Sequence, residues 1–436
     1  MDKFKFYLNK FKIYITNSAW VLGGIIIRAI ITIFIVSQIA SHIGTSEFGW
    51  YNLGISVFTV LYAVSALGLN PSFLIKYLVK GDYKEERVLG TALYSRLSAS
   101  FIILLLLAAW IYFFTSEPNY WVLIIASSAI FFQASEVIKS YYQWKLRADV
   151  YVTITTVSLV IEALLLLYGL YKGFGLLYFI SVYALERLMI LIGLLFVFNL
   201  EIKLKHLKFD IAFFKTLFLQ SWPLLFGALL TALYARFDQI LIKYFLTATD
   251  LGIYGTAIIL TQIWLIIPSL IIPVIYPKIA QLKNNSDPTK YHQLILFLYG
   301  LLNYSAIIIV LFILIFGEWI ILSLYGADYI DSVYLLYILI FNMLILFQSH
   351  LTSSVMIIEN EEKYLLKIKV VSVIVNISLN IALLATMGVK FAAYSLIIAS
   401  VISWIVMALF NKKMTQLLVL NLKSFLAPLY LKQLLK

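Results

Sequence analysis

The sequence contains no cysteine and only four histidines among its 436 residues. The absence of cysteine excludes disulfides, thiol catalysis and cysteine-ligated metals. The histidines are scattered along the chain without the spacing of a metal site, at His42, His206, His292 and His350. The phosphate-binding pattern GxxxxGK[ST] is also absent, so we do not expect this chain to hydrolyse ATP.

Charge is scarce as well. Charged residues make up 12% of the chain, whereas a soluble domain carries roughly a quarter. Hydrophobic residues make up 63%, and they form runs of about 20 residues that can each cross a bilayer core of about 30 Å. We therefore predict an all-α polytopic membrane protein with about twelve transmembrane helices, at 17–40, 48–69, 90–114, 120–140, 150–171, 174–199, 217–242, 251–275, 292–316, 332–352, 368–387 and 391–410.

The few basic residues are distributed unevenly between the two sides of the predicted membrane. Lysine and arginine gather on the side that holds both termini, and the opposite side has only Lys172, Lys243 and Lys390. The positive-inside rule places the basic side, and so both termini, in the cytoplasm. The net charge of +12 is divided among short collars beside the spans, which argues against nucleic acid as a partner.

The two halves of the chain share a pattern. Trp20 followed by Thr45–Tyr51 has a counterpart in Trp222 followed by Ala248–Tyr254, about half the chain later. In each copy we expect the polar residue and the acid to cap the next helix, and Gly49 or Gly252 to allow a tight turn. Because each half has an even number of spans, the halves are predicted to be parallel six-helix lobes related by a pseudo-two-fold axis along the membrane normal.

This repeat predicts the division of the chain into parts. The N-terminal lobe covers 17–199 and the C-terminal lobe covers 217–410, with a cytoplasmic linker at 200–216. Lysine alternates with apolar residues in the flanking segments 1–16 and 411–436, which we predict to be an interfacial segment and an amphipathic tail on the cytoplasmic side.

Short motifs in a fixed order add a resemblance to a known family. They include Asn17-Ser18-Ala19-Trp20 with Arg28, Gly44 to Tyr51, Gly68-Leu69, Phe132-Gln133-Ala134, Asp238-Gln239-Ile240, Gly252-Ile253-Tyr254, Trp264, Pro268, Pro277 and Leu324-Tyr325-Gly326 with Tyr329. In this order, the chain resembles the Wzx-type polysaccharide flippases of the multidrug/oligosaccharidyl-lipid/polysaccharide exporter superfamily. It departs from their pattern at Thr45, where proline is frequent, and at Phe391, where glycine is frequent.

The resemblance implies a function. Such a flippase moves undecaprenyl-pyrophosphate-linked oligosaccharide repeat units from the cytoplasmic to the outer leaflet by alternating access, for O-antigen (lipopolysaccharide), capsule or exopolysaccharide assembly. Its implied partners are that lipid-linked oligosaccharide, membrane lipids, and the polysaccharide polymerase with its chain-length machinery. No cofactor is implied, and coupling to protons or to sodium stays open. The implied location is the bacterial inner membrane.

The charges inside the spans are the candidate site residues. Arg28 lies about 11 residues, or ~16 Å, from either end of its span, so it needs a cavity or an ion-pair partner. A guanidinium suits pyrophosphate because it offers paired donors to phosphate oxygens. Arg236, Asp238 and Gln239 on the seventh span are further candidates for substrate binding, the last two alternatively for an inter-helix hydrogen bond. Arg96 either snorkels or meets the pyrophosphate at the cytoplasmic mouth.

Other membrane charges suggest pairing or ion coupling. Glu162 and Glu186 are candidates for binding a coupled proton. The alternative for Glu162 is an ion pair with Arg187, whose predicted depth differs by about four residues, ~6 Å. Glu136 and Lys139, three apart on a helix, are expected to form a structural ion pair.

Prolines interrupt two spans of the second half. Pro223, Pro268, Pro273 and Pro277 remove backbone hydrogen bonds and should bend their helices. The bends are either static kinks or hinges that allow one lobe to rock.

Rival functions make distinct demands on the sequence. A multidrug or cation antiporter of the same superfamily needs a carboxylate in its cavity, whereas the first span carries Arg28 and no acid. The related lipid II flippases usually have fourteen spans. A membrane glycosyltransferase or polymerase needs a substantial outer loop with acids or arginines, and the longest outer connection, 317–331, has no basic residue.

Overall fold

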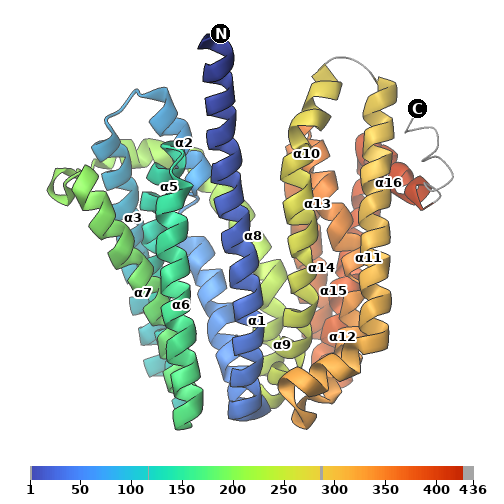
Figure 1. The fold of residues 1–436 in the computed structure, drawn as a ribbon. Coiled ribbons are helices and arrows are strands. Elements are labelled where there is room, and N and C mark those ends of the chain that lie inside the picture. The colour runs from blue at the N-terminus through green and yellow to red at the C-terminus, as the bar shows by residue number, and fades with distance from the viewer. Residues whose placement is uncertain (1, 116, 285–287, 426–436) are drawn as a thin grey trace. The chain divides into compact units, whose positions relative to one another are not determined.

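The computed structural model describes residues 2–115, 117–284 and 288–425, and within them every regular element is a helix. The chain forms two compact units, Met1–Ile240 and Leu241–Lys436. Helix α8 (Ile211–Phe245) crosses this division near its end. Figure 1 shows the helices of each unit running side by side. The predicted all-α fold class is confirmed.

The first unit contains the helices that position the candidate site. Its elements are α1 (Asp2–Ser65), α2 (Pro71–Lys80), α3 (Glu85–Phe114), η1 (Pro118–Tyr120), α4 (Trp121–Phe132), η2 (Gln133–Ser135), α5 (Glu136–Trp144), α6 (Ala148–Lys172), α7 (Leu176–Glu201), η3 (Leu204–His206) and the greater part of α8 (Ile211–Phe245).

The described part of the second unit is likewise built from helices. Its elements are α9 (Ala248–Gln262), η4 (Ile263–Leu265), α10 (Ile266–Asn284), α11 (Pro288–Tyr325), η5 (Ala327–Tyr329), α12 (Asp331–Ile340), α13 (Met343–Ile358), α14 (Glu362–Met387), α15 (Val389–Phe410) and α16 (Lys412–Ser424).

Eleven segments of the described chain are long and apolar enough to cross a membrane. The first, Gly23–Ser65, has 43 residues and is interrupted at Gly44, whose φ of 77° is not helical. That segment is long enough for two crossings, because one crossing needs about 20 residues. The predicted spans at 17–40 and 48–69 therefore correspond to the two parts of α1. The chain is a multi-pass membrane protein.

The repeated loops differ from the turns expected at Gly49 and Gly252, because both glycines are buried within helices. In the first copy the chain turns at Gly44 instead, and the Glu47 carboxylate accepts a hydrogen bond (3.2 Å) from the backbone N–H of Leu176 at the start of α7. In the second copy, Thr247 and Asp250 form a capping box at the start of α9. The predicted capping is confirmed for Asp250, whereas Glu47 caps a different helix.

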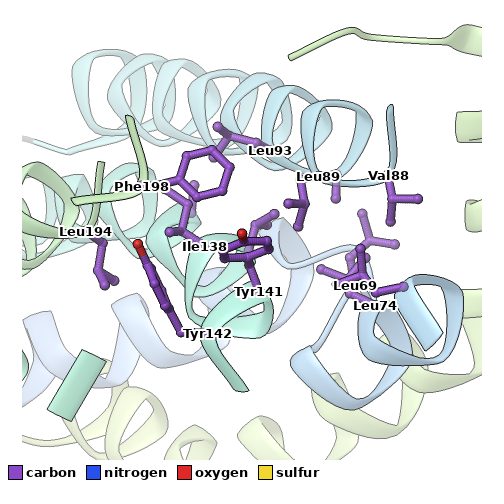
Figure 2. Packing of buried hydrophobic residues seen from close by; sticks show 14 of the residues in the cluster. Leu69, Leu74, Val88, Leu89, Leu93, Ile138, Tyr141, Tyr142, Leu194 and Phe198 are labelled. Atoms are coloured by element: carbon purple, nitrogen blue, oxygen red, sulfur yellow. The ribbon is translucent and has the colours of Figure 1, made fainter. Parts of the chain in front are cut away.

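The core of the first unit lies between the loop after α1 and helices α2, α3, α5 and α7. Figure 2 shows leucines of α3 and aromatic side chains of α5 packed around Ile138. Gly68 closes this region against α8, because a Cβ at Gly68 would lie 2.2 Å from the carbonyl oxygen of Ser221. The Ser221 hydroxyl donates a hydrogen bond to the Leu67 carbonyl (2.8 Å). A glycine is needed at residue 68, since its φ of 68° and this contact both disfavour a side chain.

The segments outside the predicted lobes are helical where they are described. Residues 2–16 continue directly into the first span as part of α1. In the tail, α16 packs in the second unit, where Asn303 on α11 donates hydrogen bonds to Asn421 (2.8 Å) and Ser424 (2.7 Å). Residues 426–436 of the predicted tail lie outside the described residues.

The prolines lie within or beside helices as predicted. Pro223 lies inside α8, and Pro273 and Pro277 lie inside α10. The short 3-10 segment η4 precedes Pro268 and separates α9 from α10. These positions are consistent with local distortion, since proline cannot donate a backbone hydrogen bond. The hinge role stays a prediction.

Candidate functional site

The charged centre of the first unit is the carboxylate of Glu186, which is fully buried on α7. Arg28, on α1, donates a hydrogen bond to one carboxylate oxygen at 2.8 Å. Arg187 pairs with the other oxygen. A carboxylate buried in the membrane is stable only with such partners, because an isolated charge there is costly. Glu186 therefore fixes two guanidinium groups that come from different helices.

Glu162, on α6, lies close enough to Glu186, Arg187 and Arg28 to interact with each electrostatically. It forms no ion pair with Arg187 in the described chain, in contrast to the pairing that helix depth favoured. Arg187 pairs with the adjacent Glu186 and stacks over the ring of Tyr183 at 5.1 Å. The four charges of Arg28, Glu162, Glu186 and Arg187 would sum to zero if all were ionised.

A cavity of about 370 Å³ opens beside this centre. Its charged lining consists of Arg28, Lys139, Arg187 and Glu136, with the polar side chains of Gln133, Gln143 and Thr155 nearby. The cavity is bounded by α1, η2, α5, α6 and α7, all from the first unit. We call it the basic pocket. None of its lining residues comes from α8, so it differs from the expected cavity between the first and seventh spans.

Arg28 combines the two roles that its sequence position left open. Its side chain is 35% exposed and lines the basic pocket, while one of its nitrogens pairs with Glu186. A guanidinium has five N–H donors, so one contact to Glu186 leaves others for a ligand. Arg28 is thus a cavity residue held in place by an ion pair.

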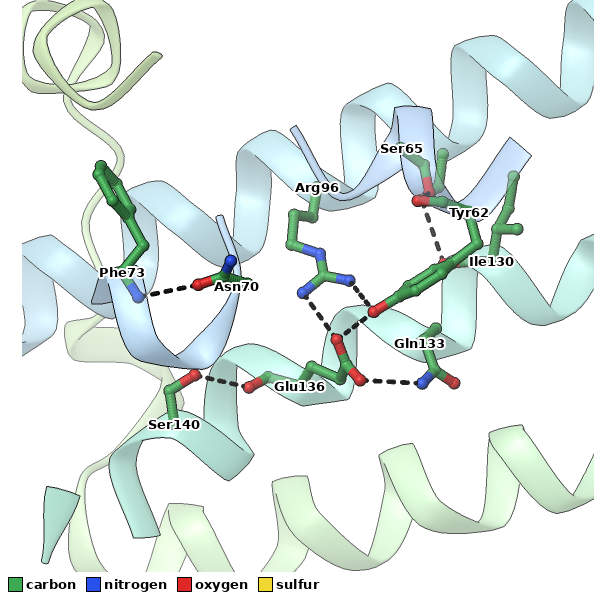
Figure 3. A network of polar contacts seen from close by, with 10 residues as sticks. Tyr62, Ser65, Asn70, Phe73, Arg96, Ile130, Gln133, Glu136 and Ser140 are labelled. Carbon is green, nitrogen blue, oxygen red and sulfur yellow. Dashed lines mark hydrogen bonds and ion pairs between the residues drawn. The ribbon is translucent and has the colours of Figure 1, made fainter. Parts of the chain in front are cut away.

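The polar network in Figure 3 corrects two of the expected assignments. Arg96, whose side chain is only 2% exposed, lies 3.5 Å from the Glu136 carboxylate, and its guanidinium is 5.6 Å from the ring centre of Tyr62. It therefore neither snorkels nor lines the basic pocket. Tyr62 and Gln133 also donate hydrogen bonds to Glu136. Arg96 takes the structural role that we expected of Lys139.

Lys139 is the site residue that sequence reasoning assigned wrongly. It makes no ion pair with Glu136 in the described structure, and its ammonium lies 5.4 Å from the ring centre of Tyr151 while lining the pocket. The i, i+3 spacing from Glu136 suggested a pair, but Arg96 from another helix takes that carboxylate. Gln143 and Tyr151 also line the pocket, and no sequence signal distinguished them from the other polar and aromatic residues.

The candidates on α8 lie outside the basic pocket. Asp238 and Gln239 are fully buried, and the Gln239 side chain accepts a hydrogen bond from Ser56 on α1 at 2.8 Å. Asp238 accepts a hydrogen bond from the Gln239 backbone N–H at 2.8 Å. This geometry favours the inter-helix alternative for Gln239. Arg236 is half-buried and is likewise absent from the pocket lining.

The arrangement is suited to binding an anion. Arg28, Lys139 and Arg187 converge on the pocket, and Glu136 is already engaged by Arg96, Tyr62 and Gln133. Guanidinium groups offer paired donors to phosphate or carboxylate oxygens, and lysine adds a mobile point charge. A cationic ligand would find no uncompensated carboxylate among these lining residues.

Solved structures place the fold in one class. A multidrug resistance MATE family transporter of the MOP superfamily in its inward-facing conformation is similar, with a TM-score of 0.67 and 12% identity over 89% of this chain and 95% of that chain. The lipid II flippase MurJ, in an inward closed conformation, has a TM-score of 0.67 and 15% identity over 96% of this chain and 93% of that chain. The chain therefore has the fold of MOP-superfamily transporters.

The sequence identifies the family within that class. Residues 39–334 match the family described as polysaccharide biosynthesis protein, which covers more than half of the chain. The chain belongs to this family. No match exists among curated proteins. The predicted resemblance to a polysaccharide family with the fold of this superfamily is confirmed.

Proposed function

We propose that this protein is a flippase that moves a pyrophosphate-linked lipid oligosaccharide across the membrane. The observation that carries the proposal is the convergence of Arg28, Lys139 and Arg187 on a pocket between transmembrane helices. Such charges are costly in a membrane and are retained where they serve a ligand or an ion path. The family and the fold support a transport role in polysaccharide assembly.

The specific cargo in this proposal is an undecaprenyl-pyrophosphate-linked repeat unit for O-antigen, capsule or exopolysaccharide. Its pyrophosphate matches the cations of the pocket in charge and in donor geometry. The polysaccharide polymerase and chain-length machinery would consume the flipped lipid. The predicted lobes at 17–199 and 217–410 would move relative to one another in alternating access, with both termini in the cytoplasm.

A cation antiporter is disfavoured by the state of Glu186. Organic cations require an available carboxylate, yet Glu186 is fully buried and shared by Arg28 and Arg187, and Glu162 does not line the basic pocket. Efflux of ethidium by cells that overproduce the protein is the corresponding measurement. We expect no increase over cells that carry an empty vector.

Deletion of the gene followed by lipid extraction tests the main proposal. We expect undecaprenyl-pyrophosphate-linked repeat unit to accumulate with its sugar inaccessible from the outer leaflet, and restoration of the gene to reverse this. Accumulation on the outer leaflet, or no accumulation, would contradict a flippase role. Turnover of a labelled sugar donor by the pure protein would instead indicate a glycosyltransferase.

Glu162 is the candidate for ion coupling in this proposal. It lies beside the Glu186 centre without an ion pair of its own, so Glu162→Gln should fold normally. If Glu162 binds a coupled proton, transport by this variant should lose its dependence on pH. Unchanged pH dependence would remove Glu162 from the coupling step.

A further inference from the structure

A second cavity lies along the seam between α1 and α6, which pack side by side in the first unit (Figure 1). This seam groove has a volume of about 500 Å³ and is bounded by Trp20 and Ile27 on α1 and by Val157 on α6, which are all exposed. Its polar side-chain groups are limited to the indole N–H of Trp20 and the hydroxyls of Thr153 and Thr156. An apolar surface of this kind is suited to a hydrocarbon chain.

The seam groove and the basic pocket share a wall. Gly24 and Val152 line both cavities. A Cβ at Gly24 would lie 3.1 Å from Val152 Cγ1, and a Cβ at Gly23 would have nothing within 4 Å. The two adjacent glycines leave this stretch of α1 without side chains. The charged pocket and the apolar groove therefore have one glycine backbone and one valine in common.

The order of residues along α1 adds to this arrangement. Arg28 follows Gly24 by four positions, so the two lie on the same face of the helix one turn apart. The cation that suits a pyrophosphate thus lies one helical turn from the wall that the two cavities share. A lipid with a charged head and a long apolar chain needs a polar site and an apolar site next to each other. Placing its charged head in an apolar groove would be costly.

We propose that the α1–α6 seam holds the apolar chain of the lipid-linked cargo while its pyrophosphate occupies the basic pocket. This inference rests on the proposed function and adds the site of the chain. The two cavities share Gly24 and Val152, so one ligand can place its head in the first and its chain in the second. This favours one amphiphilic ligand over two separate ligands. An ordinary phospholipid in the groove is the competing occupant that the test must exclude.

Photolabelling locates the chain. The probe is undecaprenyl pyrophosphate with a diazirine in its isoprenoid chain, added to the full-length protein in nanodiscs that contain phosphatidylglycerol. We expect adducts at 20–27 and 152–157 that unlabelled undecaprenyl pyrophosphate removes and that additional phosphatidylglycerol does not. Removal by phosphatidylglycerol as well would identify an ordinary lipid groove and overturn the inference.

The remaining outcomes separate the inference from the proposed function. If the adducts removed by undecaprenyl pyrophosphate lie only on other helices, the pyrophosphate lipid binds but the seam assignment is wrong. If undecaprenyl pyrophosphate removes no labelling anywhere, the proposed function itself is contradicted, and this inference with it.

Closing the seam provides an independent test. The chain has no cysteine, so a Gly24→Cys/Val152→Cys variant contains only the introduced pair. The 3.1 Å between a Cβ at Gly24 and Val152 Cγ1 is compatible with a disulfide across the shared wall. After oxidation we expect transport and specific seam labelling to fall at least about ten-fold relative to the reduced state, with recovery on reduction.

A second cysteine pair controls for the crosslink itself. A Cβ at Gly193 on α7 would lie 3.9 Å from Ile154 Cβ on α6, within the range of a disulfide. Neither residue lines the seam groove or the basic pocket. The oxidised Ile154→Cys/Gly193→Cys variant should transport as well as its reduced form. Equal transport by oxidised and reduced Gly24→Cys/Val152→Cys would refute the seam assignment.

Discussion

The charges within the membrane can be found from single residues, but the partners of those charges cannot. Arg28, Glu162, Glu186 and Arg187 are conspicuous in the sequence because apolar residues surround them. The Arg28–Glu186 pair joins positions 158 apart, which no local spacing predicts. Neighbours on a helix usually diverge, so pairing of Glu186 with Arg187 was not expected either. Lys139 was misassigned for the same reason, since its spacing from Glu136 carries no information about Arg96.

Removing the Glu186 charge should destabilise the protein. Glu186→Gln leaves Arg28 and Arg187 without their shared carboxylate, and breaking a buried pair costs about 3 to 5 kcal/mol. Glu186→Gln/Arg187→Gln should recover part of this loss, because one uncompensated charge is then gone. Thermal unfolding of the purified protein measures both effects.

A surface pair is the matched control for this prediction. Glu201 pairs with Arg147 at 2.6 Å, but both side chains are partly exposed. Glu201→Gln should therefore lose no more than about 1 kcal/mol. If Glu186→Gln unfolds at the same temperature as Glu201→Gln, the buried centre is not the stabilising element described above.

At the scale of helices, the sequence predicts the elements well and their ends less well. Spans such as 150–171 and 391–410 match α6 and α15 closely because long apolar runs determine them. The turn of the first repeat was expected at Gly49 and occurs at Gly44, since glycine alone does not reveal which position adopts a positive φ. The close approach of Gly68 to α8 depends on packing between distant segments.

A methyl group at Gly68 should be more disruptive than one at another left-handed glycine. Gly68 and Gly81 have φ values of 68° and 70°, so alanine costs each about 1 to 2 kcal/mol of conformational energy. Only at Gly68 would the methyl also meet the Ser221 carbonyl oxygen, at 2.2 Å. Gly68→Ala should therefore lower the unfolding temperature more than Gly81→Ala. Equal losses would argue against this helix contact.

The cluster around Glu359 should make the second unit sensitive to acid. Burial opposes ionisation of Glu359, but hydrogen bonds from Lys283 (2.6 Å) and Tyr291 (2.9 Å) and the charge of Lys413 outweigh it and lower the pKa of that carboxyl. A carboxyl with a lowered folded-state pKa stabilises the protein above its unfolded pKa. That contribution is lost as the pH falls through the folded pKa.

This effect can be measured by comparing unfolding temperatures of the wild-type protein and Glu359→Gln from neutral to acidic pH. The wild type should be more stable at neutral pH, and the difference should shrink as the pH falls. Glu361→Gln, a nearby carboxylate outside the cluster, is the control and should follow the wild type. A difference that does not depend on pH would exclude an ionic role for Glu359.

At the scale of the whole molecule, composition indicates a membrane protein, and the basic pocket supports the proposed transport function. A chain with 63% hydrophobic and 12% charged residues requires a membrane, and its order of spans and motifs leads to the family that residues 39–334 match. The basic pocket could not be located from the sequence, because its residues come from four helices and a 3-10 segment of the first unit. The central claim is that this pocket binds the pyrophosphate of a lipid-linked cargo.

Transport by Arg28 variants tests this claim most directly. The measurement is the rate at which lipid-linked oligosaccharide becomes accessible at the outer leaflet, in cells matched for membrane protein level. Loss of one charge-assisted contact is worth about 1.5 to 3 kcal/mol, or about ten-fold to more than a hundred-fold in affinity. Arg28→Ala should be nearly inactive and Arg28→Lys impaired, since lysine lacks paired donors. Lys172→Ala, outside the pocket, should transport normally. A wild-type rate in Arg28→Ala would contradict the claim.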